Sequence, residues 1–270
     1  MRRRNSRASY LAPLEMPLPR HPDESRDPSP SWAPAFAGVA NEEGAGTPAL
    51  AIALDRDGYA VLPGLLGADE CRELTALYDE RERFRSRVVM ARHGYGQGEY
   101  KYFTYPLPPL VGELRQMLYP LLAPLANRWQ RQLGREAAFP ATLDDYLARC
   151  HAAGQQRPTP LILKYGPGDY NCLHQDLYGE LVFPIQATVL LSRPGEDFAG
   201  GEFLLVEQRP RRQSKGEVVA LRQGDTVIFP VNHRPVSGAR GYYRATMRHG
   251  VSRVHSGSRF TLGIIFHDAA

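Results

Sequence analysis

The sequence of 270 residues has no run of about 18 or more apolar residues, and this excludes a transmembrane helix. Its three cysteines, Cys71, Cys150 and Cys172, are few and odd in number, which excludes a disulfide scaffold and is typical of a reducing cytoplasm. No apolar segment follows the basic residues at the start, so we expect no secretory signal. These absences predict a cytoplasmic protein without membrane contact, and they leave the oligomeric state open.

A change in composition occurs near residue 48. Residues 1–48 contain eight of the 23 prolines, together with six arginines and six acidic residues. Such a segment cannot bury enough apolar surface to offset the entropy that is lost on ordering. The chain as a whole is 43% hydrophobic, which is enough for one sizeable core. We therefore predict a disordered proline-rich tail over residues 1–48 and a single domain over residues 49–270.

Positive charge is concentrated toward the C-terminus. The formal net charge is +4, but residues 207–259 hold eleven Lys and Arg against three acidic residues, a local excess of +8. This pattern suits an anionic ligand, either a small dicarboxylate or a nucleic acid. An arginine-rich surface in contact with solvent explains the same pattern equally well.

The predicted domain has two parts with different sequence patterns. Residues 66–153 show helical periodicity, and the longest pattern contains Pro120 and Pro124, which we expect to bend or break the helix. From residue 160 onward, short apolar segments alternate with glycine- and proline-containing turns. The predicted strands are 161–165, 185–191, 202–207, 217–221, 226–229, 243–249 and 260–266. We expect residues 230–241 to form a long loop at the mouth of a barrel.

Many short strands at this spacing favour a mainly β architecture over a parallel sheet. The predicted fold is a cupin-like jelly-roll, or double-stranded β-helix, over residues 160–270. The N-terminal helices are predicted to pack on one face of this barrel.

The residues that most suggest chemistry are His174 and Asp176, followed much later by His249. Residues two apart on an extended segment share a face, so His174 and Asp176 can both point into a barrel. A histidine from a distant strand would complete two imidazoles and one carboxylate on one side of a metal. This arrangement leaves coordination positions open and is typical of non-haem Fe(II) oxygenases.

Two segments resemble motifs of the 2-oxoglutarate/Fe(II)-dependent dioxygenase superfamily. Residues 163–176, Leu-Lys-Tyr-Gly-Pro-Gly-Asp-Tyr-Asn-Cys-Leu-His-Gln-Asp, look like its metal-binding strand. Residues 249–259, His-Gly-Val-Ser-Arg-Val-His-Ser-Gly-Ser-Arg, look like the second half of the motif. The resemblance covers about residues 95–270 and is strongest to a bacterial branch named for oxidative demethylation of damaged DNA, which is AlkB-like and prolyl-hydroxylase-like.

The resemblance implies an enzyme that uses Fe(II), 2-oxoglutarate and dioxygen to hydroxylate a C–H bond. It implies that the iron ligands are His174, Asp176 and His249. It also implies that Arg259 binds the distal carboxylate of 2-oxoglutarate. Arginine suits this role because its planar guanidinium can make two parallel hydrogen bonds to a carboxylate, which lysine cannot.

Two further residues are candidates for contact with 2-oxoglutarate. Tyr165 matches a tyrosine that hydrogen-bonds this molecule in AlkB-type demethylases, although it could also be barrel core. Thr261 lies two residues past Arg259, so it would share the same face of a strand and be a weaker partner.

The ligand assignment has alternatives. His255 could replace His249, but it lies only one short turn from Arg259, which leaves little room for 2-oxoglutarate between them. Cys172 lies two residues before His174 and would point to the same side of a strand, so a zinc site is an alternative. No CxxC pair accompanies it. We expect His233 and His267 to be structural or loop residues.

The substrate is less clearly indicated. No second arginine occurs in residues 260–269, and Leu163 stands where AlkB-type enzymes have asparagine. Residues 95–105 are predicted to be a tyrosine-rich loop whose side chains could stack on a base, and the candidates are Tyr100, Tyr102 and Tyr105. A nucleic-acid substrate, with oxidative demethylation, is therefore one hypothesis. Hydroxylation of a protein side chain or small metabolite is another, and a non-catalytic cupin-like metal-binding protein is a third.

Overall fold

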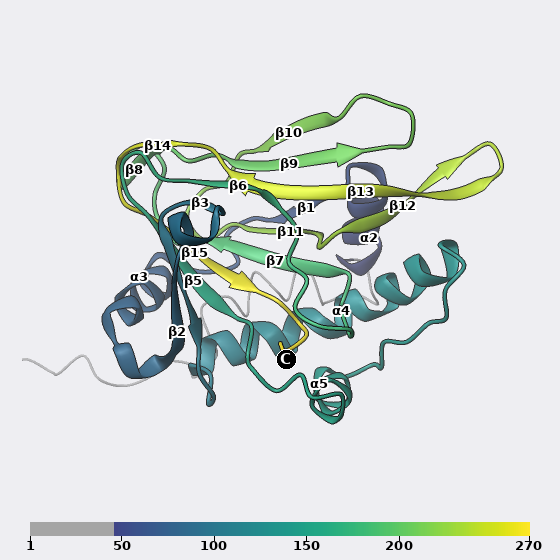
Figure 1. Ribbon diagram of the computed structural model, residues 1–270, viewed down its shortest axis with the longest axis horizontal. Coiled ribbons are helices and arrows are strands. Elements are labelled where there is room, and N and C mark those ends of the chain that lie inside the picture. Colours follow the sequence, from purple (N-terminus) through teal and green to yellow (C-terminus); the bar gives the residue numbers. More distant parts are fainter. Residues whose placement is uncertain (1–45) are drawn as a thin grey trace, which may run out of the picture. The chain divides into compact units, whose positions relative to one another are not determined.

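The structure is a computed structural model that describes residues 46–270 (Figure 1). Residues 46–48, which we expected in the tail, begin helix α2 (Gly46–Arg56), and Leu50 and Leu54 of this helix are buried. The rest of the predicted tail lies outside the described residues. Among residues 46–270, no helix combines the length and the apolar character needed to cross a membrane.

Two antiparallel sheets form the centre of the described region. The larger sheet has the strand order β1 (Ala60–Leu62), β11 (Thr226–Pro230), β7 (Ile185–Leu190), β15 (Arg259–Ile264), β5 (Leu161–Tyr165), β4 (Glu99–Phe103) and β2 (Phe84–Val89). The smaller has the order β10 (Lys215–Val219), β9 (Phe203–Gln208), β13 (Gly241–Val251), β6 (Tyr170–His174) and β3 (Gly96–Gln97), and β12 (His233–Gly238) also pairs with β13. A separate two-stranded ribbon joins β14 (Val254–Gly257) to β8 (Phe198–Gly200).

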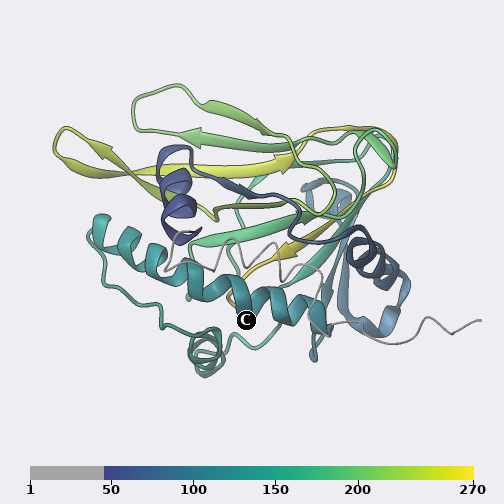
Figure 2. The same ribbon diagram turned by 180° about the vertical axis from the view of Figure 1, so that it is seen from behind.

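Helices α4 (Pro109–Gln132) and α5 (Leu143–Ala152) lie on one side of this pair of sheets, whereas α2 contacts β1 and β12 (Figure 1). Helix α4 runs beneath the larger sheet, with α5 beside it and α3 (Ala68–Ala76) near the edge formed by β2 (Figures 1 and 2). Leu262 and Ile264 of β15 belong to the same buried cluster as the apolar face of α4. The alternate residues of β15 face the space between the two sheets, and this is where the site lies.

The long helix corrects one expectation. Pro120 and Pro124 were expected to bend or break it, and a break does not occur, because α4 continues over 24 residues through both prolines. Both prolines are exposed, whereas Leu118 and Leu122 on the opposite side are fully buried. Burial of this apolar face against the sheet outweighs the backbone hydrogen bonds that the prolines remove.

The mainly β architecture with helices is confirmed, and each of the seven predicted strands overlaps an observed one. The predicted packing of the N-terminal helices on one face holds for α4, while α2 contacts β1 and β12. Two predicted loops were wrong. Residues 95–105 contain β4, because Tyr100 and Tyr102 alternate with Glu99 and Lys101 and aromatic residues favour strands. Residues 230–241 contain β12, whose Pro235 is tolerated because β12 pairs with a strand on one side only.

Candidate active site

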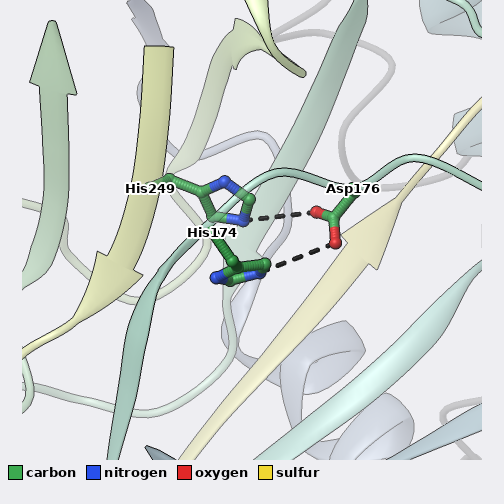
Figure 3. A group of neighbouring side chains, drawn as sticks. All are labelled: His174, Asp176 and His249. Atoms are coloured by element: carbon green, nitrogen blue, oxygen red, sulfur yellow. Dashed lines mark ion pairs between the residues drawn. The ribbon is translucent and has the colours of Figure 1, made fainter. Parts of the chain in front are cut away.

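Strands β6 and β13 bring two histidines side by side. The strands pair with His174 directly opposite His249, and the two ring centroids are 4.1 Å apart. Asp176 follows the end of β6. Its Oδ1 lies 3.5 Å from His174 Nε2, and its Oδ2 lies 3.3 Å from His249 Nε2 (Figure 3).

The donor atoms of these three side chains lie within 4.8 Å of one another, so the triad could hold a metal ion. It is the only such group of three or more His, Cys, Asp or Glu side chains in the described part of the chain. The alternatives lie elsewhere: His255 is exposed on β14, and Cys172, His233 and His267 are outside the group.

Hydrogen bonds orient two members of the triad, His174 and Asp176. His174 Nδ1 lies 2.8 Å from the backbone carbonyl of Cys172, which can only accept, so the ring proton sits on Nδ1 and leaves Nε2 available to a metal. The hydroxyl of Tyr178 donates to Asp176 Oδ1 at 2.7 Å. The amide of Gln186 donates to Asp176 Oδ2 at 3.0 Å.

The three groups shift each other's acidity. Burial alone would raise the pKa of Asp176, but the two adjacent imidazoles hold this pKa well below its ordinary range. Burial would lower the pKa of His174, but the hydrogen bond and the charge of Asp176 raise it. Burial and the neighbouring His174 lower the pKa of His249. The carboxylate is therefore ionised and His249 neutral near pH 7, which are the forms that bind a metal.

An unpaired guanidinium faces the same space. Strands β5 and β15 pair with Arg259 directly opposite Tyr165. Arg259 is only 1% exposed, and its Nε and Nη1 have no hydrogen-bond partner among the described residues. Burial lowers the pKa of Arg259 to about 10, so the group is still charged at neutral pH. A buried charge without a hydrogen-bonding partner is costly, so this end of the cavity could accept an anionic ligand.

The triad and Arg259 line one cavity of about 250 Å³ between the two sheets. Tyr165 and Thr261 also line it, and the Tyr165 hydroxyl accepts a hydrogen bond from Asn171 at 3.2 Å. Thr261 therefore shares the face of Arg259, as the alternation along β15 predicted.

The three tyrosines proposed for substrate contact are in different places. Tyr100 lines the cavity. Tyr102 packs in a separate buried cluster with Leu161. The Tyr105 hydroxyl donates to Asp268 at 2.9 Å, which places it in a buried polar network outside the cavity lining.

Sequence reasoning missed several residues of the cavity. Tyr178 lies two residues past Asp176, so the same alternation that paired His174 with Asp176 could have found it. Gln186 comes from β7 in the opposite sheet, and only the three-dimensional pairing of the sheets brings it to Asp176. Tyr95 lines the cavity from just before β3.

Comparison with known families agrees with this geometry. Residues 98–269, well over half of the chain, match the model of the Oxygenase-NA family, described as oxygenases catalysing oxidative methylation of damaged DNA. The chain belongs to the Oxygenase-NA family. The match of this Oxygenase-NA protein spans the three triad residues and Arg259.

The chain is also similar to curated relatives and to solved structures. The Oxygenase-NA chain is 55% identical over 168 residues to the uncharacterized proteins MT2286 and Rv2227 of two Mycobacterium tuberculosis strains, covering 62% of this chain and 72% of each relative. A Pseudomonas putida prolyl-4-hydroxylase matches in structure with a TM-score of 0.52 and 15% identity, over 83% of this chain and 100% of that one. A 2OG-Fe(II) oxygenase family oxidoreductase from Burkholderia pseudomallei matches with a TM-score of 0.49 and 16% identity, over 84% of this chain and 94% of that one. The prolyl-4-hydroxylase likeness is one of fold, and it confirms the predicted jelly-roll.

Proposed function

We propose that this protein is an Fe(II)- and 2-oxoglutarate-dependent dioxygenase that hydroxylates a C–H bond. The observation that carries the proposal is the pairing of two features in one cavity. A triad of His174, Asp176 and His249 lies on one side, and the buried, unpartnered guanidinium of Arg259 lies on the other. A protein that only binds a metal has no need for the second feature.

The triad fits Fe(II). Two imidazole nitrogens and one carboxylate provide three ligands on one face and leave the remaining positions open. The Nδ1 proton of His174 is held by a backbone carbonyl, so its Nε2 is presented in the correct tautomer. Tyr178 and Gln186 hold the Asp176 carboxylate in place, since each donates to a different oxygen.

The opposite end of the cavity fits a dicarboxylate. Arg259 would pair with the distal carboxylate of 2-oxoglutarate, because its guanidinium is buried and its Nε and Nη1 have no partner among the described residues. A planar guanidinium can make two parallel hydrogen bonds to such a carboxylate. Tyr165 and Thr261 would add hydroxyl donors from the same wall. Apolar walls, such as Leu163 and Phe203, would keep water from competing for the charge.

Bound iron would supply the activation of dioxygen, which couples the decarboxylation of 2-oxoglutarate to succinate with hydroxylation of the substrate. The residues of the chain orient the co-substrate between Arg259 and the triad and leave the cavity mouth for the substrate. An oxygenase attacks a methyl group by oxidising its C–H bond, so the reaction that we propose on nucleic acid is oxidative demethylation.

An alkylated nucleic acid is the substrate that we propose. The family description names damaged DNA. Tyr95 is 49% exposed and lines the cavity together with Tyr100, so the two rings are available to stack on an unpaired base.

Exposed arginines on the smaller sheet also support a nucleic-acid substrate. Arg244 and Arg248 of β13 alternate with the buried Ala245, Met247 and His249, so they point away from the space between the sheets. Arg211 and Arg212 are exposed in the turn between β9 and β10. Such exposed cations suit the phosphates of a nucleic-acid backbone.

The experiment is succinate release by the iron-loaded protein with 2-oxoglutarate and a panel of methylated oligonucleotides, peptides and metabolites. We expect stimulation by a methylated oligonucleotide and its loss in His174→Ala. Succinate release by His174→Ala at the native rate would contradict the dioxygenase proposal. Stimulation of succinate release only by a peptide or a metabolite would be consistent with the dioxygenase proposal but would overturn the proposed nucleic-acid substrate.

A further inference from the structure

A double-glycine turn lies directly against Arg259. Gly200 ends β8 and Gly201 follows it, and both have positive φ angles, +73° and +64°. The Gly201 N–H donates to the Arg253 carbonyl at 3.0 Å, which fixes the turn against the segment that leads into β15. The turn is therefore fixed beside the Arg259 side chain.

Gly201 has no space for a side chain. A Cβ atom at this position would lie 2.9 Å from Arg259 Cδ and 2.8 Å from Val254 Cγ2. Both distances are shorter than a normal carbon–carbon contact, so one of the two side chains would have to move. Val254 is fully buried and short, whereas the Arg259 side chain is long and flexible.

Arg259 has another space that it could enter. A second cavity of about 240 Å³ lies on the side of Gly201, and Arg259 lines both this cavity and the cavity of the triad. Its other walls are mainly apolar and include Leu190, Phe198 and Leu221. A Cβ at position 201 would press on Arg259 Cδ, and the two cavities leave the guanidinium room to take up another position.

We propose that Gly201 is a positioning residue that keeps Arg259 extended toward the triad and thereby sets the preference for a 2-oxo acid with a distal carboxylate. The inference rests on the proposed function, because it assumes that Arg259 binds that carboxylate. The position of the guanidinium then depends on the absence of a side chain at position 201 and not on the strand register alone.

The test measures ligand binding by calorimetry in protein loaded with Mn(II), without turnover. The two ligands are 2-oxoglutarate and 2-oxopentanoate, which has the same chain length but lacks the distal carboxylate. In Gly201→Ala, we expect the Kd for 2-oxoglutarate to rise about tenfold or more, while the Kd for 2-oxopentanoate and the Mn(II) affinity stay unchanged. A general structural defect would raise the Kd of both ligands alike, and that result would overturn the proposal.

The matched control is Gly64→Ala. Gly64 has a similar φ of +58°, but a Cβ there would meet nothing within 4 Å, so the variant carries the backbone strain without the contact to Arg259. We expect Gly64→Ala to bind 2-oxoglutarate as the wild type does. If Gly201→Ala failed to fold while Gly64→Ala folded, the glycine would be structural and the proposal would be wrong.

A double-mutant cycle separates this inference from the proposed function. If Gly201 acts through Arg259, adding Gly201→Ala to Arg259→Ala should cause no further loss of 2-oxoglutarate affinity. An additional loss of the same size in that background would overturn the positioning role. Wild-type affinity in Arg259→Ala would instead overturn the co-substrate assignment on which the inference rests.

Discussion

The two histidines of the triad are held in different ways. A backbone carbonyl orients His174, whereas His249 is 8% exposed and is held mainly by packing, with its ring 4.8 Å from the ring of Phe229. Its Nδ1 has no hydrogen-bond partner among the described residues. The position of His249 therefore depends mainly on the pairing of β13 with β6, which places it opposite His174.

We predict that His249→Ala loses Fe(II) binding and that His255→Ala keeps it. Nε2 of His249 faces Asp176, whereas His255 lies exposed on β14. Metal affinity measured by equilibrium dialysis would distinguish the two variants, with circular dichroism as the check on folding. Loss of iron in His255→Ala with retention in His249→Ala would move the third ligand to His255.

A second buried histidine predicts a dependence of stability on pH. Burial, aided by the charge of Arg115, lowers the pKa of His267 to about 4 from the ordinary value of 6.5. Since the unfolded chain binds the proton more readily, this contribution to stability is fully present above pH 6.5. It is lost as the pH falls from 6.5 toward 4, with a total of about 3 kcal/mol.

His267→Asn should reduce this acid sensitivity. The Phe183 N–H donates to His267 Nδ1 at 3.3 Å, and the asparagine carbonyl oxygen can accept the same bond without titrating. Urea unfolding at pH 7 and pH 4 would show a smaller loss of stability in the variant than in the wild type. Equal losses in both proteins would contradict the effect of burial on His267.

At the scale of the elements, a buried ion pair connects β12 to β9. Arg234 of β12 is 1% exposed, and its Nε donates to Glu207 of β9 at 2.7 Å. Its Nη1 donates to the carbonyl of Asp55 in α2 at 2.7 Å. The segment that we expected to be a loop is therefore a strand whose basic residue has an internal structural role.

Arg234→Ala should lower the free energy of unfolding by about 3 kcal/mol, because it leaves Glu207 buried with only Arg209 as a partner. Arg244→Ala is the control: Arg244 is exposed on the neighbouring strand, and its loss should change stability by less than about 0.5 kcal/mol. Urea unfolding measures both. Equal stabilities of the two variants would contradict the internal role of Arg234.

Across the whole described region, the basic excess of residues 207–259 divides into two groups. Arg234 and Arg259 are buried, while Arg244 and Arg248 point outward from the smaller sheet. The smaller sheet, which lies on the side of the cavity opposite α4 (Figures 1 and 2), thus carries exposed arginines on its outer face. The sequence left a dicarboxylate and a nucleic acid as alternative ligands, and in the proposed function the buried Arg259 would serve the first and the exposed arginines the second.

If the outer arginines contact phosphates, replacing Arg244 and Arg248 by Ala should reduce the slope of log affinity against log salt by about 2 for duplex DNA. Fluorescence anisotropy with a labelled oligonucleotide measures this slope. The charge-matched control is Arg72→Ala with Arg81→Ala, since both arginines are exposed, one in α3 and one shortly after it. The same slope in both double variants would contradict a specific role for the smaller sheet.

Local features of this site could be predicted from sequence. Alternation along a strand placed His174 with Asp176 and Arg259 with Thr261, and the cavity contains both pairs. The family motif added His249. No local pattern in the sequence predicts that this residue lies directly opposite His174.

The remaining features depend on tertiary structure. Gln186 reaches Asp176 from the other sheet, and Tyr105 is withdrawn from the cavity by its bond to Asp268, 163 residues away in sequence. Helix α4 continues through two prolines because burial of its apolar face outweighs the low helix propensity of proline. Contacts between distant segments decide such positions, and a single sequence does not reveal them.

The most direct test of the proposed function is anaerobic titration of the Fe(II)-loaded protein with 2-oxoglutarate, followed by the charge-transfer absorbance of the complex. We predict saturable binding in the wild type. In Arg259→Ala, affinity should be about ten- to a hundredfold weaker with unchanged iron binding, and Arg259→Lys should fall between the two. Equal 2-oxoglutarate affinity in the wild type and Arg259→Ala would contradict the co-substrate site and leave only a metal-binding protein.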